Sequence, residues 1–267
     1  MARAFRIGLI GLGAIGKDLI GRIRAGTLGA VECTGVLVRR ERTDAGVPGL
    51  TADPARFFAG RYDAVVEGAG HQAVRDHGER ALRGGADLLL TSVGALTDDA
   101  LFDRLGRAAR ESGRRLILPS AGIGALDILA AGAVGGLDRV TVTVRKDPLS
   151  WKGTAAESLV DLDALAAPAT LYDGPVREGA RAYPRNVNIA AAAAIAGIGL
   201  DRTRLVIVAD PTIAVHVVEI EAEGAFGRFT FREEVVPTLD NPKTGRLVAM
   251  AIAKTVRQMA GSVVVGA

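Results

Sequence analysis

Cysteine, aromatic residues and long apolar runs are all scarce in this 267-residue sequence. The single cysteine, Cys33, excludes a disulfide within the chain and is typical of a reducing compartment. Aromatic residues make up 4%, which argues against a surface that binds nucleic acid by stacking on its bases. No apolar run reaches the roughly 18 residues that a membrane-spanning helix needs. We therefore expect a cytoplasmic protein that binds neither nucleic acid nor a membrane.

Charges of one sign do not cluster either. The 33 lysines and arginines, against 30 acidic residues, are scattered along the chain, so that no basic stripe for nucleic acid is expected. The first apolar run, "FRIGLIG", begins at Phe5 and leaves no room for a signal peptide before it. A hydrophobic content of 49% is enough for one large core or two modest ones.

The first half of the sequence alternates apolar runs with segments of helical periodicity. The run "FRIGLIGLG" is followed by a segment in which Ile15, Leu19 and Ile23 recur at helical spacing. Apolar strands separated by helices are typical of a parallel sheet that is covered on both faces. We therefore predict an α/β fold that starts with a doubly wound Rossmann domain over residues 1–122.

The second half follows a different pattern. "DRVTVTVRKD" alternates with a period of two, and a hairpin is expected to turn near Gly224–Gly227. These patterns predict an α+β domain with a mainly antiparallel sheet over residues 123–240. The last segment, 241–267, is expected to form a helix that returns to the first domain, with Asn241 as its cap and Pro242 at its first position.

A glycine motif directly follows the first predicted strand. Gly11, Gly13 and Gly16 form G-x-G-x-x-G between a strand and a helix, which is the setting in which this motif binds a dinucleotide. The first glycine permits a tight turn, and the second lets the backbone approach a pyrophosphate at the helix N-terminus. Ala14 and Ile15, inside the motif, are expected to line the same site. A glycine-rich turn without a ligand is the alternative.

The end of the second predicted strand bears on the choice of cofactor. An acidic residue at this point normally binds the ribose 2′-hydroxyl of NAD, but "GVLVRRER" has Arg39 and Arg40 there. Because arginine can bind a 2′-phosphate, NADP is favoured and NAD remains possible. The alternatives are that both arginines are solvated surface residues, or that Glu41 binds the ribose.

Two further strand ends are expected to border the cofactor. The segments "EGAGH" and "TSVGA" follow the third and fourth predicted strands, and their small residues would let nicotinamide and its ribose lie against the backbone. The residues predicted to line the cofactor here are Ala69, Gly70, His71, Ser92, Val93 and Gly94. His71 is equally consistent with a helix start that has no ligand.

Several segments, in order across nearly the whole chain, resemble the L-aspartate dehydrogenase family. They are "GLGAIG", "SVGAL", "PSAGIGALD", "SWKGTA", "NVNIAAAAAIAGIGLDRTRLVIVADP", "EGAFGRF" and "NPKTG". The resemblance implies a Rossmann domain followed by a sheet domain that closes over the substrate. It implies NAD(P)-dependent oxidation of L-aspartate to iminosuccinate, or the reverse reductive amination. Hydride would pass directly between the Cα and nicotinamide, without a metal, and a homodimer through the second sheet is expected by analogy of fold.

The resemblance also implies roles for individual residues. Ala121 and Gly122 would contact the cofactor, although their order is exchanged relative to the family's segment. Asn188 would contact nicotinamide, with a helix cap as its alternative. A dicarboxylate substrate needs cationic or hydrogen-bonding partners, and each cationic candidate is equally consistent with a surface charge. The candidates are Lys146, Lys152, Thr154, Asn186 and Lys243.

The sequence departs from the family at the catalytic histidine. A gapless match puts that histidine at Val218, whereas this chain has its histidine two residues earlier, at His216. Residues two apart on a strand point to the same side, and histidine can accept a proton near neutral pH. Three interpretations stay open: His216 is a displaced base, it orients a different substrate, or it is a core histidine without a chemical role.

The predicted activity is that of an NAD(P)-dependent amino-acid dehydrogenase. One alternative is an NADPH-dependent reductase of an imine or an aldehyde, which would not use ammonia. The other is a non-catalytic NADP(H)-binding protein that has lost its base. Asp147 weakens the case for aspartate itself, because a carboxylate facing the substrate would repel another carboxylate.

Overall fold

The computed structural model divides into two compact units, which are described separately. Residues 1–121 and 238–267 form the first unit, and residues 122–237 form the second. The structure describes residues 3–41, 43–44, 46–120, 124–184, 187–236 and 245–266. Within these ranges, no helix is both long and apolar enough to cross a membrane.

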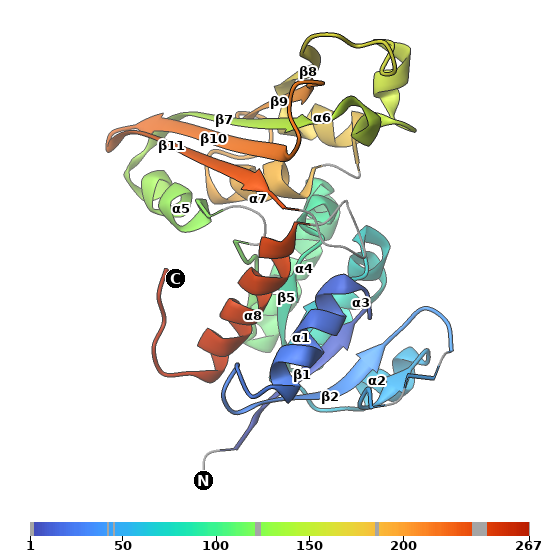
Figure 1. The fold of residues 1–267 in the computed structure, drawn as a ribbon. Helices are drawn as coiled ribbons and strands as arrows, with labels where there is room; N and C mark the ends of the chain where they lie inside the picture. The colour runs from blue at the N-terminus through green and yellow to red at the C-terminus, as the bar shows by residue number, and fades with distance from the viewer. Residues whose placement is uncertain are drawn as a thin grey trace. The chain divides into compact units, whose positions relative to one another are not determined.

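A six-stranded parallel sheet forms the centre of the first unit (Figure 1). In the order β3-β2-β1-β4-β5-β6, every pair of neighbours is parallel. The strands are β1 (Phe5–Ile10), β2 (Val31–Leu37), β3 (Leu50–Thr51), β4 (Ala64–Glu67), β5 (Asp87–Leu90) and β6 (Leu116–Ile117). The predicted parallel sheet is confirmed. The strand order reverses between β1 and β4, which is where sheets of this kind bind their ligands.

Helices cover both faces of this sheet because successive strand residues point to opposite sides. In β5, Leu89 belongs to the core cluster that includes residues of α1 and α8, whereas Leu88 lies beside α3 and α4. The helices of this unit are α1 (Ala14–Arg24), α2 (Pro54–Phe58), α3 (His71–Arg83), the 3-10 helix η1 (Val93–Thr97), α4 (Asp99–Ser112) and α8 (Arg246–Ala260).

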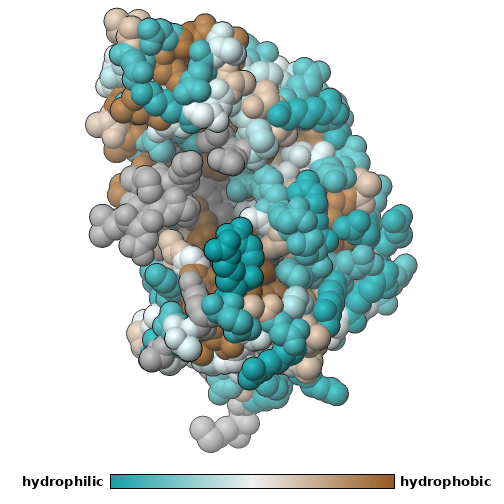
Figure 2. Space-filling view, turned by 90° about the vertical axis from the view of Figure 1, so that its right-hand side faces the viewer, coloured by the Kyte–Doolittle hydropathy of each residue, from teal (hydrophilic) through white to brown (hydrophobic). Residues whose placement is uncertain are grey.

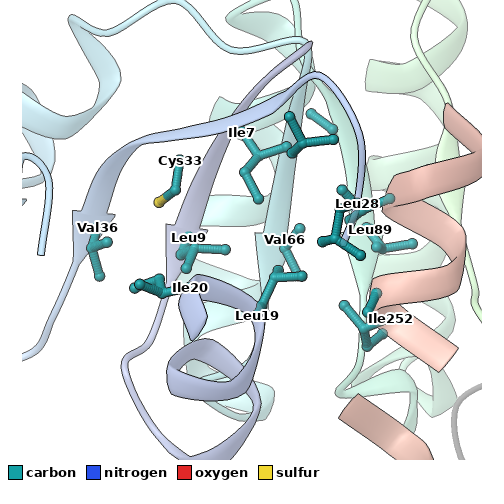
Figure 3. Close-up of a cluster of buried hydrophobic side chains, with 14 of the residues drawn as sticks. Ile7, Leu9, Leu19, Ile20, Leu28, Cys33, Val36, Val66, Leu89 and Ile252 are labelled. Carbon is teal, nitrogen blue, oxygen red and sulfur yellow. The ribbon is translucent and has the colours of Figure 1, made fainter. Parts of the chain in front are cut away.

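A buried apolar cluster joins the C-terminal helix α8 to the beginning of the chain (Figure 3). Ile252 of α8 and Leu19 of α1 are both almost fully buried in this cluster with Leu9 of β1. Cys33 lies in the same core, where burial raises the pKa of its thiol to about 11.

The predicted start of the last helix was wrong. Gly245 is the N-cap of α8 and has an extended backbone, with ψ at 145°, so the helix begins at Arg246 rather than at Pro242. Asn241 and Pro242 themselves lie outside the described residues.

The second unit is built on a five-stranded sheet in the order β11-β10-β7-β9-β8. Only the β7–β9 pair among its described neighbours is parallel, which confirms the predicted, mainly antiparallel sheet. The β10–β11 hairpin turns where expected, with Gly224 paired to Gly227. The strands are β7 (Leu137–Lys146), β8 (Ala169–Pro175), β9 (Arg204–Ala209), β10 (His216–Gly224) and β11 (Gly227–Val235). The helices are α5 (Leu126–Gly135), η2 (Pro148–Trp151), η3 (Ala155–Ser158), α6 (Val176–Ala182) and α7 (Asn188–Ala196).

The register of β10 determines which of its residues share a face of the sheet. His216 and Val218 lie two apart and therefore point to the same face, as do the partners of Val218, Val144 in β7 and Glu233 in β11. Helices α5 and α7 contact this sheet through β10 and β7, and Val140 on the same face lies beside Gly197 at the end of α7. Val218 is only 2% exposed, so the face is well packed at that position.

Charged side chains are distributed over the surface rather than gathered in one region. Ion pairs such as Arg3–Asp63, Arg83–Glu79 and Arg177–Asp201 occur in both units and are at least partly exposed. On the face seen in Figure 2, hydrophilic side chains dominate and hydrophobic ones form smaller groups between them. Exposed ion pairs of this kind stabilise a fold little.

We predict that Ile252→Ala destabilises the protein by about 2–5 kcal/mol, because it removes a fully buried side chain and leaves a cavity in the first unit. Urea unfolding of the full chain measures this change. Met250→Ala on the same helix is the matched control, since Met250 is 47% exposed and should cost no more than about 0.5 kcal/mol. Equal losses in the two variants would show that α8 is not docked through Ile252.

Candidate functional site

The turn between β1 and α1 leaves no room for side chains at two of its three glycines. Gly11 has a φ of +101°, and a Cβ atom there would lie 2.9 Å from the carbonyl oxygen of Gly68. A Cβ atom at Gly16 would lie 2.6 Å from the carbonyl oxygen of Gly11. The first and third glycines are therefore required by the close approach of α1 to β1 and of β1 to the end of β4.

Gly13, in contrast, faces open space. A Cβ atom there would have no atom within 4 Å, apart from those of its own residue and its chain neighbours. Gly13 is the N-cap of α1, no side chain caps that helix, and its first turn contains no acidic residue. A helix N-terminus with these properties attracts an anion, so the site fits the pyrophosphate of a dinucleotide. Ala14 and Ile15 form the first positions of α1, and Ile15 lies against Gly68.

The end of β2 presents two cations. Arg39 and Arg40 are exposed directly after this strand, and neither forms an ion pair with any residue in the described part of the chain. Glu41, the alternative ribose partner, accepts a hydrogen bond from the backbone N–H of Ala52 at 3.1 Å. The arginines are thus available to an anion at the strand end where a ribose 2′-phosphate is bound in folds of this type.

The ends of β4 and β5 are linked by a buried carboxylate whose role the sequence analysis missed. Glu67 is 1% exposed and accepts hydrogen bonds from the backbone of Ala69 (2.7 Å) and Gly70 (2.8 Å). Ser92 donates to it through its backbone N–H (3.1 Å) and its hydroxyl (3.0 Å). The available signal was an acidic residue at the end of the apolar run "AVVE", because buried carboxylates are rare unless they are paired.

The remaining residues predicted at these strand ends have mixed surroundings. Ala69 is exposed, Gly70 is the N-cap of α3 with a φ of +114°, and His71 is the first residue of α3. Val93 and Gly94 are buried in η1. Four predicted site residues lie outside the described residues: Ala121, Gly122, Asn186 and Lys243.

In the second unit, His216 lies in a small polar cluster. Its Nε2 is 3.1 Å from the hydroxyl oxygen of Ser150, which belongs to η2. The sheet register brings Lys146, at the end of β7, next to the start of β10, and its Nζ lies 5.1 Å from the ring centroid of Trp151. Partial burial lowers the pKa of His216, the charge of Lys146 lowers it further, and Asp147 opposes both effects. The imidazole is therefore neutral at pH 7 and can accept a proton.

Other candidates for the substrate have local partners. Lys152 forms an ion pair with Asp163 at 2.6 Å, and the Thr154 hydroxyl caps η3 by accepting from the N–H of Ala156. Asp147 caps η2 by accepting from the N–H of Leu149 at 2.8 Å. This cap engages one oxygen of the Asp147 carboxylate, but the group keeps its charge and lies close enough to His216 to raise the pKa of that histidine. The objection that Asp147 raises against an acidic substrate therefore stands.

Asn188 occupies the first position of α7, and its side chain is exposed. Its predicted contact with nicotinamide stays a prediction, whereas the alternative role as the helix cap was wrong. Val187, not Asn188, is the N-cap of the helix.

Two protein-family models match the chain in succession. The NAD binding domain of homoserine dehydrogenase matches residues 11–119, and the C-terminal domain of aspartate dehydrogenase matches residues 127–259. The L-aspartate dehydrogenase of Ruegeria pomeroyi is 44% identical over 261 residues, which cover 97% of this chain and 94% of that protein. The L-aspartate dehydrogenase of Cupriavidus necator is 38% identical over 263 residues, which cover 96% of this chain and 98% of that protein.

Solved structures show the same fold. The crystal structure of aspartate dehydrogenase from Thermotoga maritima superposes with a TM-score of 0.79 at 23% identity, covering 98% of this chain and all of that chain. An amine dehydrogenase from Mycobacterium smegmatis gives a TM-score of 0.57 at 13% identity, covering 97% and 93%. These structures show the fold alone, whereas the sequence relatives favour an amino-acid dehydrogenase over the reductase and binding-protein alternatives.

We predict that Gly13→Ala and Gly16→Ala fail in different ways. The added methyl at residue 13 enters open space, so the free energy of unfolding should change by no more than about 1 kcal/mol. It should nevertheless weaken NADPH binding at least about tenfold, because it occupies the approach to the pyrophosphate. The methyl at residue 16 meets the Gly11 carbonyl and should destabilise the fold by about 1–3 kcal/mol.

Fluorescence titration with NADPH and urea unfolding of both variants measure these two effects. Wild-type affinity in Gly13→Ala would contradict the location of the pyrophosphate at this turn.

Proposed function

This chain belongs to the L-aspartate dehydrogenase family, as the sequence resemblance predicted, and we propose that it interconverts L-aspartate and iminosuccinate with NADP. It is an NAD(P)-dependent oxidoreductase that acts on an amino acid. The observation that carries the mechanistic part of the proposal is the cluster of His216, Ser150 and Lys146. It supplies a proton acceptor on β10, the strand on which the sequence resemblance places the family's histidine, at Val218.

Oxidation of an amino acid at Cα requires both a hydride acceptor and a proton acceptor. The nicotinamide, when bound, accepts the hydride or returns it to the imine. The α-ammonium group must first lose a proton, because a positively charged nitrogen cannot supply the electron pair of the new C=N bond. His216, which is neutral at pH 7, accepts this proton at a ring nitrogen, and in the reverse direction it returns the proton.

Ser150 is suited to hold the imidazole through both states. A hydroxyl can donate to a neutral ring nitrogen and accept from a protonated one, so the contact at 3.1 Å survives the proton transfer. Lys146 supplies a point charge for a substrate carboxylate. Burial and, to a smaller extent, the charge of Lys146 lower the pKa of His216 before the substrate arrives, and a bound carboxylate would offset that charge and make His216 a stronger base.

The proposed preference for NADP rests on Arg39 and Arg40, since Glu41 is engaged with the backbone of Ala52. The substrate is a small molecule in this proposal. A homodimer formed through the sheet of the second unit and a cytoplasmic location stay predictions.

We predict that His216→Ala lowers kcat/KM at least about a hundredfold while NADPH affinity stays unchanged, because general-base catalysis contributes factors of this size. Turnover is followed as NADPH consumption with oxaloacetate, and it should require ammonium. In the oxidative direction, the wild-type rate should fall as the pH drops through the pKa of His216. That pKa lies below the ordinary value for histidine, which is about 6.5. The acid limb should be absent from the variant.

His77→Ala is the matched control. His77 is also partly buried with a lowered pKa, but it lies on α3 against the ring of Phe58. Full turnover in His216→Ala, or an unchanged acid limb, would exclude His216 as the base. A rate of NADPH consumption that does not depend on ammonium would instead indicate a reductase of another substrate.

We predict that the double variant Arg39→Ala/Arg40→Ala raises KM for NADPH by about 10- to 100-fold and leaves KM for NADH nearly unchanged. A charge-assisted hydrogen bond to a 2′-phosphate is worth about 1.5–3 kcal/mol, which corresponds to this range. Arg61→Ala is the control, because Arg61 is exposed just before β4, at the opposite end of the sheet. An unchanged ratio of the two KM values would mean that these arginines do not select the cofactor.

A further inference from the structure

We propose that Glu67 is a positioning residue for the nicotinamide half of the cofactor. Its carboxylate ties together the two loops that follow β4 and β5, on the side of the sheet where that half is expected to bind. The inference rests on the proposed function for the identity of the ligand, but its structural basis lies entirely within the first unit.

The hydrogen bonds to Glu67 favour an ionised carboxylate. Oε1 of Glu67 accepts from the N–H of Ala69, the N–H of Gly70 and the hydroxyl of Ser92, and Oε2 accepts from the N–H of Ser92. Three of the four donors are backbone N–H groups, which can only donate, so they offer no acceptor for a proton on Glu67. Burial raises the pKa of Glu67, and these hydrogen bonds oppose the rise.

The two loops depend on this one side chain for their shape. Gly70 has a φ of +114° at the start of α3, and its N–H points to Glu67. Ser92 is the N-cap of η1, but its hydroxyl makes no capping hydrogen bond to that helix and instead donates to Glu67. The two residues that follow Glu67 lie against the glycine turn, since a Cβ atom at Gly11 would meet the carbonyl of Gly68 and the Cβ of Ala69.

The strand order indicates which half of the cofactor these loops serve. In folds of this type, the 2′-group of the adenosine ribose binds at the end of β2, on one side of β1. The order β2-β1-β4-β5 puts the loops held by Glu67 on the other side of β1. A dinucleotide with its pyrophosphate at Gly13 would therefore direct its nicotinamide half toward them.

Asp87 is a buried, hydrogen-bonded carboxylate like Glu67, but it has no expected part in cofactor binding and therefore serves as the control. It is 7% exposed, and it accepts hydrogen bonds from the backbone of Arg115 (2.9 Å) and from its guanidinium (2.6 and 3.0 Å). Asp87 begins β5, whereas Glu67 ends β4, so the two carboxylates lie at opposite ends of the same sheet.

The experiment compares Glu67→Gln with Asp87→Asn in the full chain. Calorimetric titration measures the Kd of NADPH and the Kd of 2′-phospho-ADP-ribose, which is the corresponding fragment without nicotinamide. The same comparison is made with NADH and ADP-ribose. Glutamine keeps the size of Glu67 but replaces one acceptor oxygen by a donor. We expect Glu67→Gln to weaken binding of the whole dinucleotide about tenfold or more. The affinity for the fragment should stay within about twofold, and Asp87→Asn should leave the ratio of the two Kd values unchanged.

If Glu67→Gln does not fold, Ser92→Ala removes one of the four donors and should change the same ratio in the same direction by a smaller factor. Equal losses for dinucleotide and fragment would reduce Glu67 to a structural residue and overturn the proposal, as would wild-type affinities in Glu67→Gln. A wild-type protein that binds neither ligand would overturn the nucleotide site itself, and the Glu67 proposal with it. These outcomes separate a failure of the inference from a failure of the proposed function.

Discussion

The close contact of backbone with backbone at the end of β1 is the constraint on which the nucleotide site depends. Gly16 brings α1 against the Gly11 carbonyl, and Gly11 in turn meets Gly68 at the end of β4. A side chain at either position would push these elements apart. Because they stay together, the N-terminus of α1 opens at the reversal of strand order, and Gly13 is left facing free space.

The features that the sequence predicted correctly have local causes. The glycine turn between β1 and α1, the helix α1 itself and the β10–β11 hairpin each follow from residues that are neighbours in the chain. The features that it missed depend on partners far apart in sequence. Glu67 and Ser92 are 25 residues apart, and His216 and Ser150 are 66 apart. The hydrophobic periodicity of the sequence does not reveal which residues form such pairs. It also does not reveal the ion pair between Lys152 and Asp163.

The chemistry of the proposed reaction is divided between the two units. The first unit holds the groups proposed to bind the dinucleotide, which are the uncapped N-terminus of α1 and two exposed arginines after β2. The second unit holds the neutral imidazole, its hydroxyl partner and a lysine. If the family's histidine corresponds to Val218, as the resemblance implies, a base at His216 would lie on the same face of β10, about 6.6 Å along the strand. A base can be moved in this way only in steps of two residues, because a shift of one would turn it to the opposite face.

Transfer of hydride from the Cα of L-aspartate is the central claim, and isotope transfer tests it most directly. The protein is incubated with L-aspartate deuterated at Cα and with NADP, and the mass of the reduced cofactor is measured. The account predicts one deuterium in each molecule of NADPH that forms. Reduced cofactor without deuterium, or no reduction of NADP or NAD by L-aspartate, would contradict it.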